Sequence, residues 1–322
     1  MGMSRALITG IGGFAGQHLA AALAQQGTAF AGYTLSSEGN AEFDHVSAYG
    51  DINDVDRMTE VLAKDPPDVV FHLAGVAATG AAWDDRRRVF EVNVLGTSSC
   101  LAAVAAAAPG ARVVLVSSGL VYGHVDAGLL PVDESHPRSP RSPYAASKTC
   151  AEIVATEFCQ SHDLDLVTVR PFNFAGPGQG LGFVAADFAC QVAQIEAGVT
   201  PPTIKVGNLE AERDFTDVRD FVQGLVAAAK RGQSGTTYNL CNARPVAIRS
   251  VLDSLVAAAT VAVAVESDPK RMRPSDVPRF IGDNTRAATD LGWRPRIPFE
   301  QTLADTLNWW RERVAQNQVV DG

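Results

Sequence analysis

The sequence predicts an α/β fold in which a parallel sheet, covered by helices on both faces, is followed by a smaller second unit. Up to residue 171, short apolar runs alternate with segments that have the apolar spacing of a helix, which is the pattern of successive βαβ units. A glycine-rich turn joins the first strand, 5–9, to the first helix, and beyond residue 171 the alternation lapses. The 322 residues suffice for one large α/β domain or for two domains of unequal size.

The glycine-rich turn is Thr9-Gly-Ile-Gly-Gly-Phe-Ala-Gly16, and it opens a helix expected over 14–26. Strand, glycine turn and helix form the context in which such a pattern binds a dinucleotide. We expect Gly10 to allow the turn, Gly13 to let the backbone approach a pyrophosphate, and Gly16 to let the helix pack on the strand. The helix N-terminus then faces the phosphates. The cofactor-binding residues expected here are Gly10, Gly13, Phe14, Ala15 and Gly16.

The second strand is expected over 28–33, and the residues at its end distinguish the two nicotinamide dinucleotides. An acid there grips the ribose 2′-hydroxyl, whereas a basic or polar pocket accepts a 2′-phosphate. The run Tyr33-Thr-Leu-Ser-Ser37 contains no acid. Ser36 and Ser37 could bind a phosphate or simply form a polar turn. The sequence therefore slightly favours NADP(H) over NAD(H).

Two further segments are expected to touch the cofactor. Asp51 and Ile52 follow a third short strand, where Asp51 could contact the adenine or cap a helix expected over 53–63. The strand Asp68-Val-Val-Phe-His-Leu-Ala-Gly75 ends in small residues that let a cofactor pass close to the backbone. The cofactor-binding residues expected at its end are Leu73, Ala74 and Gly75.

Two polar residues in this part of the chain are expected to be structural. His72 lies inside an apolar strand, where a packed core histidine is commoner than a catalytic one. Asn93 lies among apolar neighbours in a helical segment, 84–108, and a buried amide of that kind usually ties backbone together.

The strand expected over 112–117 delivers Ser117 and Ser118 to its carboxyl end, the edge at which open parallel sheets bind ligands. After a loop, a helix expected over 144–161 opens with Tyr144-Ala-Ala-Ser-Lys148. Residues four apart share a helix face, so Tyr144 and Lys148 can face one site or form an ordinary surface pair. A phenol has a pKa of about 10, and a nearby ammonium lowers it toward the working range. Such a pair suits proton transfer to a carbonyl or from a hydroxyl.

Composition excludes several classes of protein. A net charge of −9 argues against a general nucleic-acid or membrane-surface protein. The five cysteines have no metal-ligand spacing, and their odd number suits reduced thiols in the cytoplasm, so we expect no metal site. Apolar runs stay shorter than the about 18 residues of a membrane span, and we expect neither such a span nor a signal peptide. Further elements are expected as a strand over 165–170, helices over 183–198, 248–259 and 299–315, and a strand over 236–241.

Taken together, three motifs resemble those of the extended short-chain dehydrogenase/reductases, in the nucleotide-sugar epimerase/dehydratase branch. They are the glycine turn, Ser-Ser-x-x-Val-Tyr-Gly at 117–123, and Tyr-x-x-x-Lys beginning 26 residues after Ser118, and the branch's closing Asp290-Leu-Gly-Trp-Arg-Pro295 is also present. The resemblance implies a Rossmann doubly wound parallel sheet that binds NAD(P), with a smaller C-terminal α/β substrate-binding domain. The NAD(P)-binding domain would span 1–172 plus about 217–245, and the nucleotide-sugar domain about 173–216 plus 246–322.

The resemblance also implies roles for the candidate catalytic residues. Tyr144 would be the acid/base, Lys148 would hold the nicotinamide ribose and tune Tyr144, and Ser118 would orient the reacting oxygen of the substrate. Ser118 takes this role because it lies four residues before Tyr122, whereas Ser117 would be a hydrogen bonder at the strand end.

Further contacts follow from the second half of the chain. Pro171 would touch the cofactor, and Asn173 would hold the sugar diphosphate. The runs 207–215 and 273–277 resemble motifs of enzymes that handle GDP-mannose derivatives. Arg213 suits a diphosphate, unless it pairs with Asp214 or Asp217. Arg273 would reinforce Arg213 and Asp276 would accept from a ribose, unless both form surface ion pairs.

The residues after Ser118 distinguish reduction from dehydration. A dehydratase of this branch carries a glutamate two residues after its catalytic Ser or Thr, but Gly119 and Leu120 cannot carry a proton. The resemblance is therefore to GDP-4-keto-6-deoxy-mannose reductases, which implies NAD(P)H-dependent reduction of the C4 ketone of a GDP-linked 4-keto-6-deoxy sugar. The alternatives are a 4-epimerase with retained NAD, a dehydratase, or a non-catalytic NAD(P)-binding protein. The face of the ketone (rhamnose or talose product) and a heptose substrate stay open.

Members of this family commonly form homodimers through a four-helix interface made by helices equivalent to 84–108 and 144–161. The alanine-rich stripes of these helices permit such close packing, although they would equally suit packing on the sheet.

Overall fold

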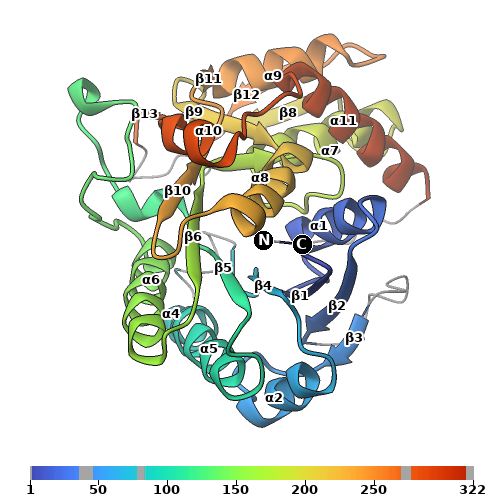
Figure 1. The fold of residues 1–322 in the computed structure, drawn as a ribbon. Helices are drawn as coiled ribbons and strands as arrows, with labels where there is room; N and C mark the ends of the chain where they lie inside the picture. The colour runs from blue at the N-terminus through green and yellow to red at the C-terminus, as the bar shows by residue number, and fades with distance from the viewer. Residues whose placement is uncertain (1, 36–45, 78–82, 84, 270–276, 317–322) are drawn as a thin grey trace.

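The computed structural model describes residues 2–35, 46–77, 83, 85–269 and 277–316. Their main feature is a seven-stranded sheet in the order β10-β6-β5-β4-β1-β2-β3, in which every neighbouring pair is parallel (Figure 1). Its strands are β1 Arg5–Thr9, β2 Ala29–Thr34, β3 Val46–Tyr49, β4 Val69–His72, β5 Arg112–Val116, β6 Leu166–Pro171 and β10 Thr237–Leu240. The chain starts in the middle of the sheet and builds outward in both directions, so the predicted doubly wound fold is confirmed.

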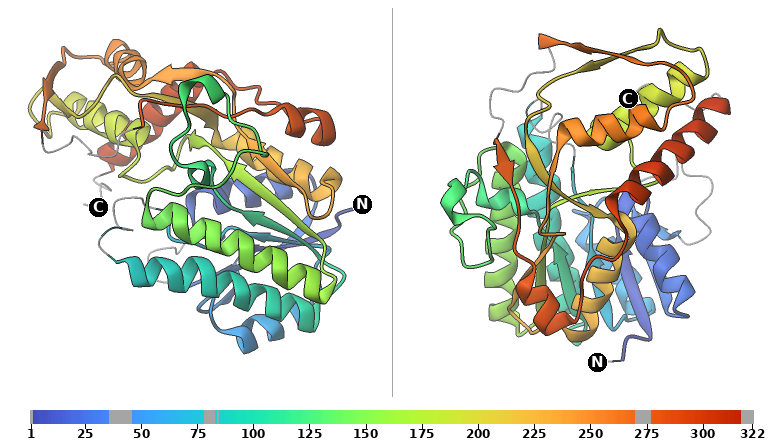
Figure 2. Two further views of the ribbon diagram at one scale, coloured as in Figure 1. Left: turned by 90° about the vertical axis from the view of Figure 1, so that its left-hand side faces the viewer. Right: turned by 90° about the horizontal axis from the view of Figure 1, so that it is seen from above.

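Helices cover both faces of this sheet (Figure 2). One face is covered by α1 Phe14–Gln25, α8 Val218–Arg231 and α10 Thr285–Leu291, and the other by α2 Val55–Lys64, α5 Gly96–Ala107 and α6 Pro143–His162. Successive strand residues point to opposite faces, so Ile8 joins the first core and Leu7 the second. Burial on both faces explains why these strands appear as continuous apolar runs in the sequence.

The helical segment predicted over 84–108 contains an irregularity that the sequence did not reveal. It consists of α4 Arg86–Phe90, a π-helical turn Glu91–Leu95 and α5. Single π-helical turns are rare and frequently lie at functional sites. The run Arg86–Ala107 is long and apolar enough to span a membrane by length and composition, although 44% of its apolar window is buried, and core helices of soluble proteins pass the same test.

A second core lies beyond the carboxyl edge of the large sheet. Three helices enclose it, α7 Val184–Glu196, α9 Ile248–Ala257 and α11 Phe299–Ala315, which confirms the three predicted helices. The sequence did not predict its short strands, which pair as β11-β9-β13 with β7 on β9, and as β8 with β12. They are β7 Asn173–Ala175, β8 Thr203–Val206, β9 Glu212–Asp217, β11 Pro245–Ala247, β12 Ala264–Ser267 and β13 Arg279–Phe280.

The last quarter of the chain contributes to both cores. Trp293 packs in the core of the large sheet with Leu291, and its indole nitrogen donates to the Asp220 carbonyl at 2.9 Å. The Asp220 carboxylate then accepts from the backbone N–H groups of Arg296 and Ile297 at 2.8 and 2.7 Å. The closing motif therefore fastens the end of the chain to α8 before α11 returns to the second core.

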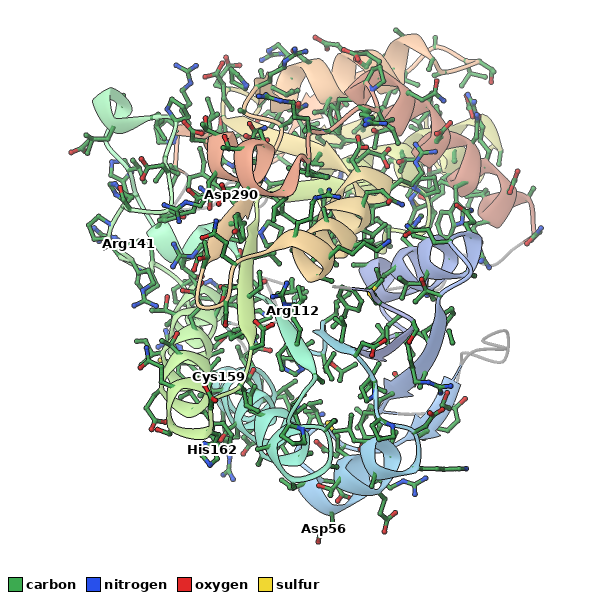
Figure 3. All side chains as sticks on the ribbon, viewed as in Figure 1. Asp56, Arg112, Arg141, Cys159, His162 and Asp290 are labelled. Carbon is green, nitrogen blue, oxygen red and sulfur yellow. The ribbon has the colours of Figure 1, made fainter. Side chains whose placement is uncertain are left out.

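The amino edge of the large sheet is held by Arg112, at the start of β5 (Figure 3). Arg112 donates to Asp165, just before β6, at 2.8 Å and to the Ala229 carbonyl of α8 at 3.0 Å. All five cysteines are free thiols, and all but Cys150 are buried.

Candidate active site

The glycine turn has the close contacts that its residue types require. Gly10 has φ +71°, and a Cβ at this position would lie 2.9 Å from the Ala74 backbone. A Cβ on Gly16 would overlap the Gly10 carbonyl and lie 2.7 Å from Ile11 Cα. Gly13 precedes α1 as its N-cap in an extended conformation. The turn is thus compact enough to bring the N-terminus of α1 next to the ends of β1 and β4, although contact with a cofactor stays a prediction.

Replacing Gly16 by alanine is expected to destabilise the fold by about 1–3 kcal/mol, because the added methyl group meets backbone atoms that cannot move aside cheaply. Chemical denaturation measures this difference. Gly110→Ala is the matched control, since a Cβ there meets nothing within 4 Å. Equal stability of the two variants would contradict the packing role of Gly16.

The first turn of α1 also contacts the segment after β6. The Phe14 ring stacks on Phe174 with centroids 5.9 Å apart, and His18 Nε2 lies 2.8 Å from the Pro177 carbonyl oxygen. The predicted dinucleotide turn is therefore held against the stretch that carries Asn173. Ala15 packs against the core of the large sheet.

The remaining candidate cofactor residues include Asp51 and Ile52, which follow β3. The Asp51 carboxylate accepts from the backbone and side chain of Asn53 at 2.9 and 3.0 Å, and Asp54 caps α2, which begins at Val55. The alternative in which Asp51 caps that helix is therefore wrong, because the helix begins later than expected. Ile52 is buried against Gly96. Four candidates lie outside the described residues: Ser36, Ser37, Arg273 and Asp276.

His72 is the packed core histidine that the sequence predicts. Its two ring nitrogens lie 2.9 Å from the Thr9 hydroxyl and 3.1 Å from the Thr97 hydroxyl. Burial, followed by the charge of Lys148, lowers the pKa of His72 to about 3. The imidazole is therefore neutral at physiological pH.

The structure brings Ser118 and Tyr144 together. Ser118 follows β5 and caps a 3₁₀ turn, Gly119–Tyr122, by accepting from the Leu120 backbone N–H at 3.2 Å. Its side chain is hydrogen-bonded to Tyr144, whose ring packs against Val89. Burial raises the pKa of Tyr144 to about 12, and the bond to Ser118 opposes this shift. Tyr144 is therefore a neutral phenol that can donate a proton.

Lys148 completes the predicted trio. Its Nζ donates to the Val116 carbonyl at 2.9 Å, and a Cβ on Gly75 would lie 3.3 Å from the same Nζ. Burial lowers the pKa of Lys148 to about 8, while the charge of Glu152 opposes this shift. The pKa of Tyr144 is thus set by burial and by Ser118, while the Lys148 ammonium is directed at the end of β5.

Asn93 ties this centre together, as the sequence predicts for a buried amide. From the π-helical turn its Oδ1 accepts from the Val76 backbone N–H at 2.8 Å, and its Nδ2 donates to the Ser147 hydroxyl at 2.9 Å. Ser147 stands between Tyr144 and Lys148 in α6. Asn93 thus fastens the catalytic turn of α6 to the segment that follows Gly75, a contact that sequence spacing does not reveal.

The predicted substrate residues meet on β7 and β9. Asn173 Nδ2 donates to the Asp214 carbonyl at 3.3 Å, and Arg213 Nη1 donates to the Val277 carbonyl at 2.6 Å. The buried Asp214 carboxylate accepts from the backbone N–H groups of Asn242, Ala243 and Gly282 at 2.7, 2.9 and 3.2 Å. Asp214 therefore holds the strand on which Arg213 lies.

Asp214 and Asp217 were the alternative partners proposed for Arg213. Burial raises the pKa of Asp214 to about 6, against the effect of its backbone hydrogen bonds. Asp217 binds Arg219 at 2.7 Å and accepts from the Thr302 hydroxyl at 2.7 Å. The structure thus gives both carboxylates other partners.

The surroundings of Gly119 and Leu120 are apolar. A Cβ on Gly119 would lie 2.9 Å from the Phe172 ring, so a larger residue does not fit without rearrangement. Leu120 packs against the Tyr144 and Val89 side chains. The position at which a dehydratase carries its glutamate is therefore occupied by the apolar side chain of Leu120, beside Tyr144.

Comparison with known proteins agrees with this geometry. The family model described as GDP-mannose 4,6 dehydratase matches residues 7–306. The chain belongs to this family. It is 33% identical to the GDP-6-deoxy-D-mannose reductase of Pseudomonas aeruginosa, over 97% of this chain and 99% of that protein. It is also 33% identical to a UDP-glucose 4-epimerase of Mycolicibacterium smegmatis, over 96% of this chain and 99% of that protein.

A solved structure of this family gives the same fold. It is described as RMD from Pseudomonas aeruginosa complexed with NADPH, and it matches 96% of this chain and 99% of its own with a TM-score of 0.87 at 33% identity. The expected Rossmann fold, the epimerase/dehydratase branch and the expectation of an NAD(P)-dependent enzyme are confirmed. The residues present fit an NAD(P) cofactor, because the compact glycine turn and the small residues at the end of β4 are the features that such a site needs.

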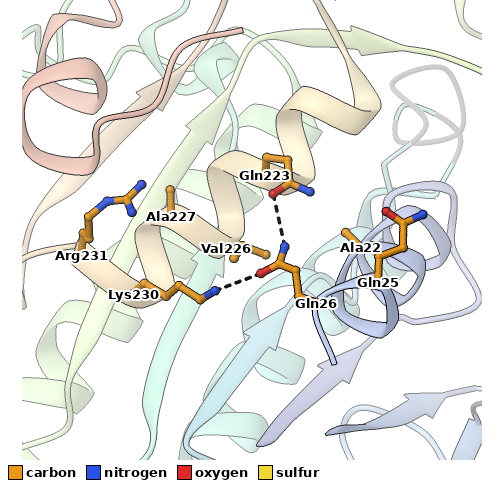
Figure 4. Close-up of a pocket in the computed structure, with 8 residues that line it drawn as sticks. All are labelled: Ala22, Gln25, Gln26, Gln223, Val226, Ala227, Lys230 and Arg231. Atoms are coloured by element: carbon orange, nitrogen blue, oxygen red, sulfur yellow. Dashed lines mark hydrogen bonds between the residues drawn. The ribbon is translucent and has the colours of Figure 1, made fainter. Parts of the chain in front are cut away.

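A separate hollow of about 450 Å³ lies between α1 and α8 (Figure 4). In it, Lys230 donates to Gln26 at 2.9 Å, and Gln26 donates to Gln223 at 3.3 Å. Gln26 follows the C-terminal end of α1, so this hollow lies toward the amino edge of the sheet, away from Ser118 and Tyr144.

Proposed function

We propose that the protein reduces the C4 ketone of a GDP-linked 4-keto-6-deoxy sugar, GDP-4-keto-6-deoxy-D-mannose or a close analogue, to the GDP-6-deoxy sugar. One observation carries this proposal: Tyr144 is a buried neutral phenol bound to Ser118, with Leu120 packed beside it where dehydration would need a carboxylate. The similarity to the Pseudomonas aeruginosa reductase over nearly the whole chain supports the same reaction.

In this mechanism, bound NAD(P)H supplies the hydride to C4. Tyr144 gives its proton to the oxygen on which negative charge develops, and Ser118 donates a hydrogen bond to the same oxygen. Lys148 stabilises the phenolate that remains. The low exposure of all three side chains, 7–9%, keeps water away and strengthens each of these interactions.

Substrate binding is assigned to the residues on β7 and β9. Asn173 and Arg213 would hold the diphosphate, because a guanidinium binds phosphate oxygens through charge-assisted hydrogen bonds. Arg213 is tethered to Val277, directly after the stretch that contains Arg273 and Asp276. The assignment of those two residues to the GDP moiety stays a prediction from the sequence.

A nucleotide-sugar 4-epimerase is the second candidate, because the Mycolicibacterium smegmatis epimerase has the same percentage identity to this chain, 33%, as the reductase. The two are separated by following NADPH or NADH absorbance with GDP-4-keto-6-deoxy-D-mannose. The reductase consumes cofactor in proportion to substrate, whereas an epimerase interconverts sugars without net consumption. A non-catalytic NAD(P)-binding protein would neither consume cofactor nor interconvert sugars. NMR of the product then identifies the configuration at C4.

We propose NADP(H) as the preferred cofactor, because no acid follows β2 in the run that ends at Ser37. The ratio of kcat/KM for NADPH and NADH measures this preference, and a ratio below one would overturn it. We also propose that the core built on the seven-stranded sheet binds NAD(P), that the second core binds the nucleotide sugar, and that the enzyme works in the cytoplasm, where its five free thiols stay reduced.

We further infer a homodimer through a four-helix interface. Phe90 and Leu95 on the α4–α5 segment and Ile153 on α6 are 38–57% exposed, on helices that pack against each other. Such side chains favour burial against a second copy of the same face.

Replacing Ile153 by glutamate is expected to shift the protein from dimer to monomer, because an unpaired charge in an apolar interface is costly. Sedimentation velocity measures the change against the 34.0 kDa chain mass. Val199→Glu is the control, since Val199 is 63% exposed but lies after α7. A wild-type monomer, or a dimer that survives Ile153→Glu, would refute this interface.

A further inference from the structure

A buried carboxylate lies one helical turn beyond Lys148. Glu152 is 3% exposed and accepts from Ser117 Oγ at 2.5 Å. Arg170 binds both of its oxygens, Nε at 2.9 Å and Nη2 at 2.7 Å, and Arg138 Nη1 adds a contact at 3.1 Å. The lone pairs of this carboxylate are therefore occupied by donors from the residue after β5, from β6 and from the loop before α6.

Two of these partners, Ser117 and Arg170, stand next to a candidate residue of the active site. Ser117 directly precedes Ser118, and Arg170 directly precedes Pro171. Arg170 also donates from Nη1 to the Tyr122 hydroxyl at 2.9 Å, and Tyr122 ends the 3₁₀ turn that Ser118 caps. The Glu152 carboxylate is thus the point at which the catalytic helix, the Ser118 strand and the cofactor-side strand are joined.

Stability alone is a weak reason for this arrangement. Taking two charges out of water offsets much of the attraction between them, and apolar residues of similar volume often stabilise such positions as well. Glu152 instead shares a helix face with Tyr144 and Lys148, eight and four residues earlier. That placement sets a fixed negative charge behind the two groups that carry protons.

We propose that Glu152 is a positioning residue, which holds Ser118 in place beside Tyr144 and Lys148 and, through its negative charge, keeps the proton on Lys148. This role rests on the proposed function, in which the Lys148 ammonium stabilises the phenolate that proton transfer leaves on Tyr144. Glu152 acts through its neighbours and touches neither substrate nor cofactor.

The charges around Lys148 determine in which direction its pKa changes when the charge of Glu152 is removed. Tyr144 and Glu152 face it from its own helix, His72 faces it from β4 as a neutral ring, and Arg170 and Arg138 lie behind Glu152. Burial disfavours the charged form of Glu152, but Arg170, Ser117 and Arg138 outweigh it and keep the pKa of this carboxyl below its ordinary value. Glu152 is therefore an anion throughout the working range.

Removing that anion favours proton loss from Lys148, so its ammonium would titrate at lower pH. The charged form of Lys148, which stabilises the phenolate, exists below this titration and disappears above it. Glu152→Gln should therefore move the alkaline limb of the kcat profile to lower pH by about one unit. It should also lower kcat about tenfold, because Ser118 is held less firmly in position beside Tyr144 and Lys148.

Matched variants separate charge from position. Ser117→Ala removes one hydrogen bond and no charge, so it should lower kcat without moving the alkaline limb. Glu157→Gln removes a charge from the exposed side of the same helix and should leave both quantities unchanged. A profile of Glu152→Gln that superimposes on the wild type would overturn the proposal, whatever happens to its melting temperature.

Glu152→Gln leaves Arg170 buried without its partner and could fail to fold. The double variant Glu152→Gln/Arg170→Gln removes both charges, and it should show a smaller shift in the same direction because Glu152 is nearer to Lys148. A wild-type profile in the double variant would also overturn the proposal.

The dissociation constant of NADPH, measured by its fluorescence at a series of pH values, provides a readout that does not depend on turnover. NADPH affinity should fall as Lys148 loses its proton, and this fall should begin at lower pH in the Glu152 variants. Absence of turnover in the wild type would refute the proposed reaction and leave this test intact. Identical pH dependence of binding in all proteins would refute the role of Glu152 alone.

Discussion

Replacing Tyr144 by phenylalanine is expected to lower kcat by a hundredfold or more, since a positioned acid or base contributes about 10²–10⁴ to the rate. The variant loses only the hydroxyl. Its ring still packs against Val89 and Leu120, so stability and NADPH binding should change little. With Ser118 as the remaining donor, the oxygen at C4 is polarised but receives no proton.

Stopped-flow or steady-state absorbance of NADPH with the GDP-linked ketone measures this loss. Tyr49→Phe is the matched control, because Tyr49 ends β3 and is 41% exposed. Near-normal turnover in Tyr144→Phe would remove Tyr144 from the mechanism. Equal losses in both variants would point to a general effect of the substitution.

Replacing Lys148 by methionine is expected to lower kcat/KM by about a hundredfold, with weaker NADPH binding as well as slower turnover. Methionine retains the apolar stem but loses the ammonium that donates to the Val116 carbonyl and lies beside Gly75. Without that charge the phenolate left by proton transfer is poorly stabilised, and the proposed ribose contact is lost.

Single-turnover rates at saturating NADPH separate the two effects, because they exclude cofactor binding. Lys205→Met, on the exposed side of β8, is the control. If Lys148→Met affects only the NADPH dissociation constant and leaves the single-turnover rate intact, Lys148 has no part in proton transfer.

Several features of the fold could be predicted because they depend on short-range patterns. The glycine turn, the alternation of apolar strands and helices, and the four-residue spacing of Tyr144 and Lys148 are local signals. Each of these patterns depends only on residues close together in the sequence. The structure places Ser118, Tyr144 and Lys148 near one another, as expected. His72 was assigned to the core for the same reason, since it lies inside an apolar strand.

Other features appear only when segments far apart in the sequence meet. The tie from Asn93 to Ser147 depends on a π-helical turn, and the buried Asp214 carboxylate binds amides from two later turns. Burial, which the sequence does not quantify, raises the pKa of Tyr144, and the lowering of this pKa by Lys148 stays a prediction.

The sequence by itself determined the fold class and the family and singled out Ser118, Tyr144 and Lys148 as the proposed catalytic trio, because residue identity and spacing carry those signals directly. Glu152 was not singled out from the sequence, because nothing in its spacing distinguishes it from an exposed acid. Only the tertiary structure decided that this carboxylate is buried and bound by Ser117 and Arg170. Burial and pairing depend on how α6, β5 and β6 pack together, and that packing is a property of the whole chain.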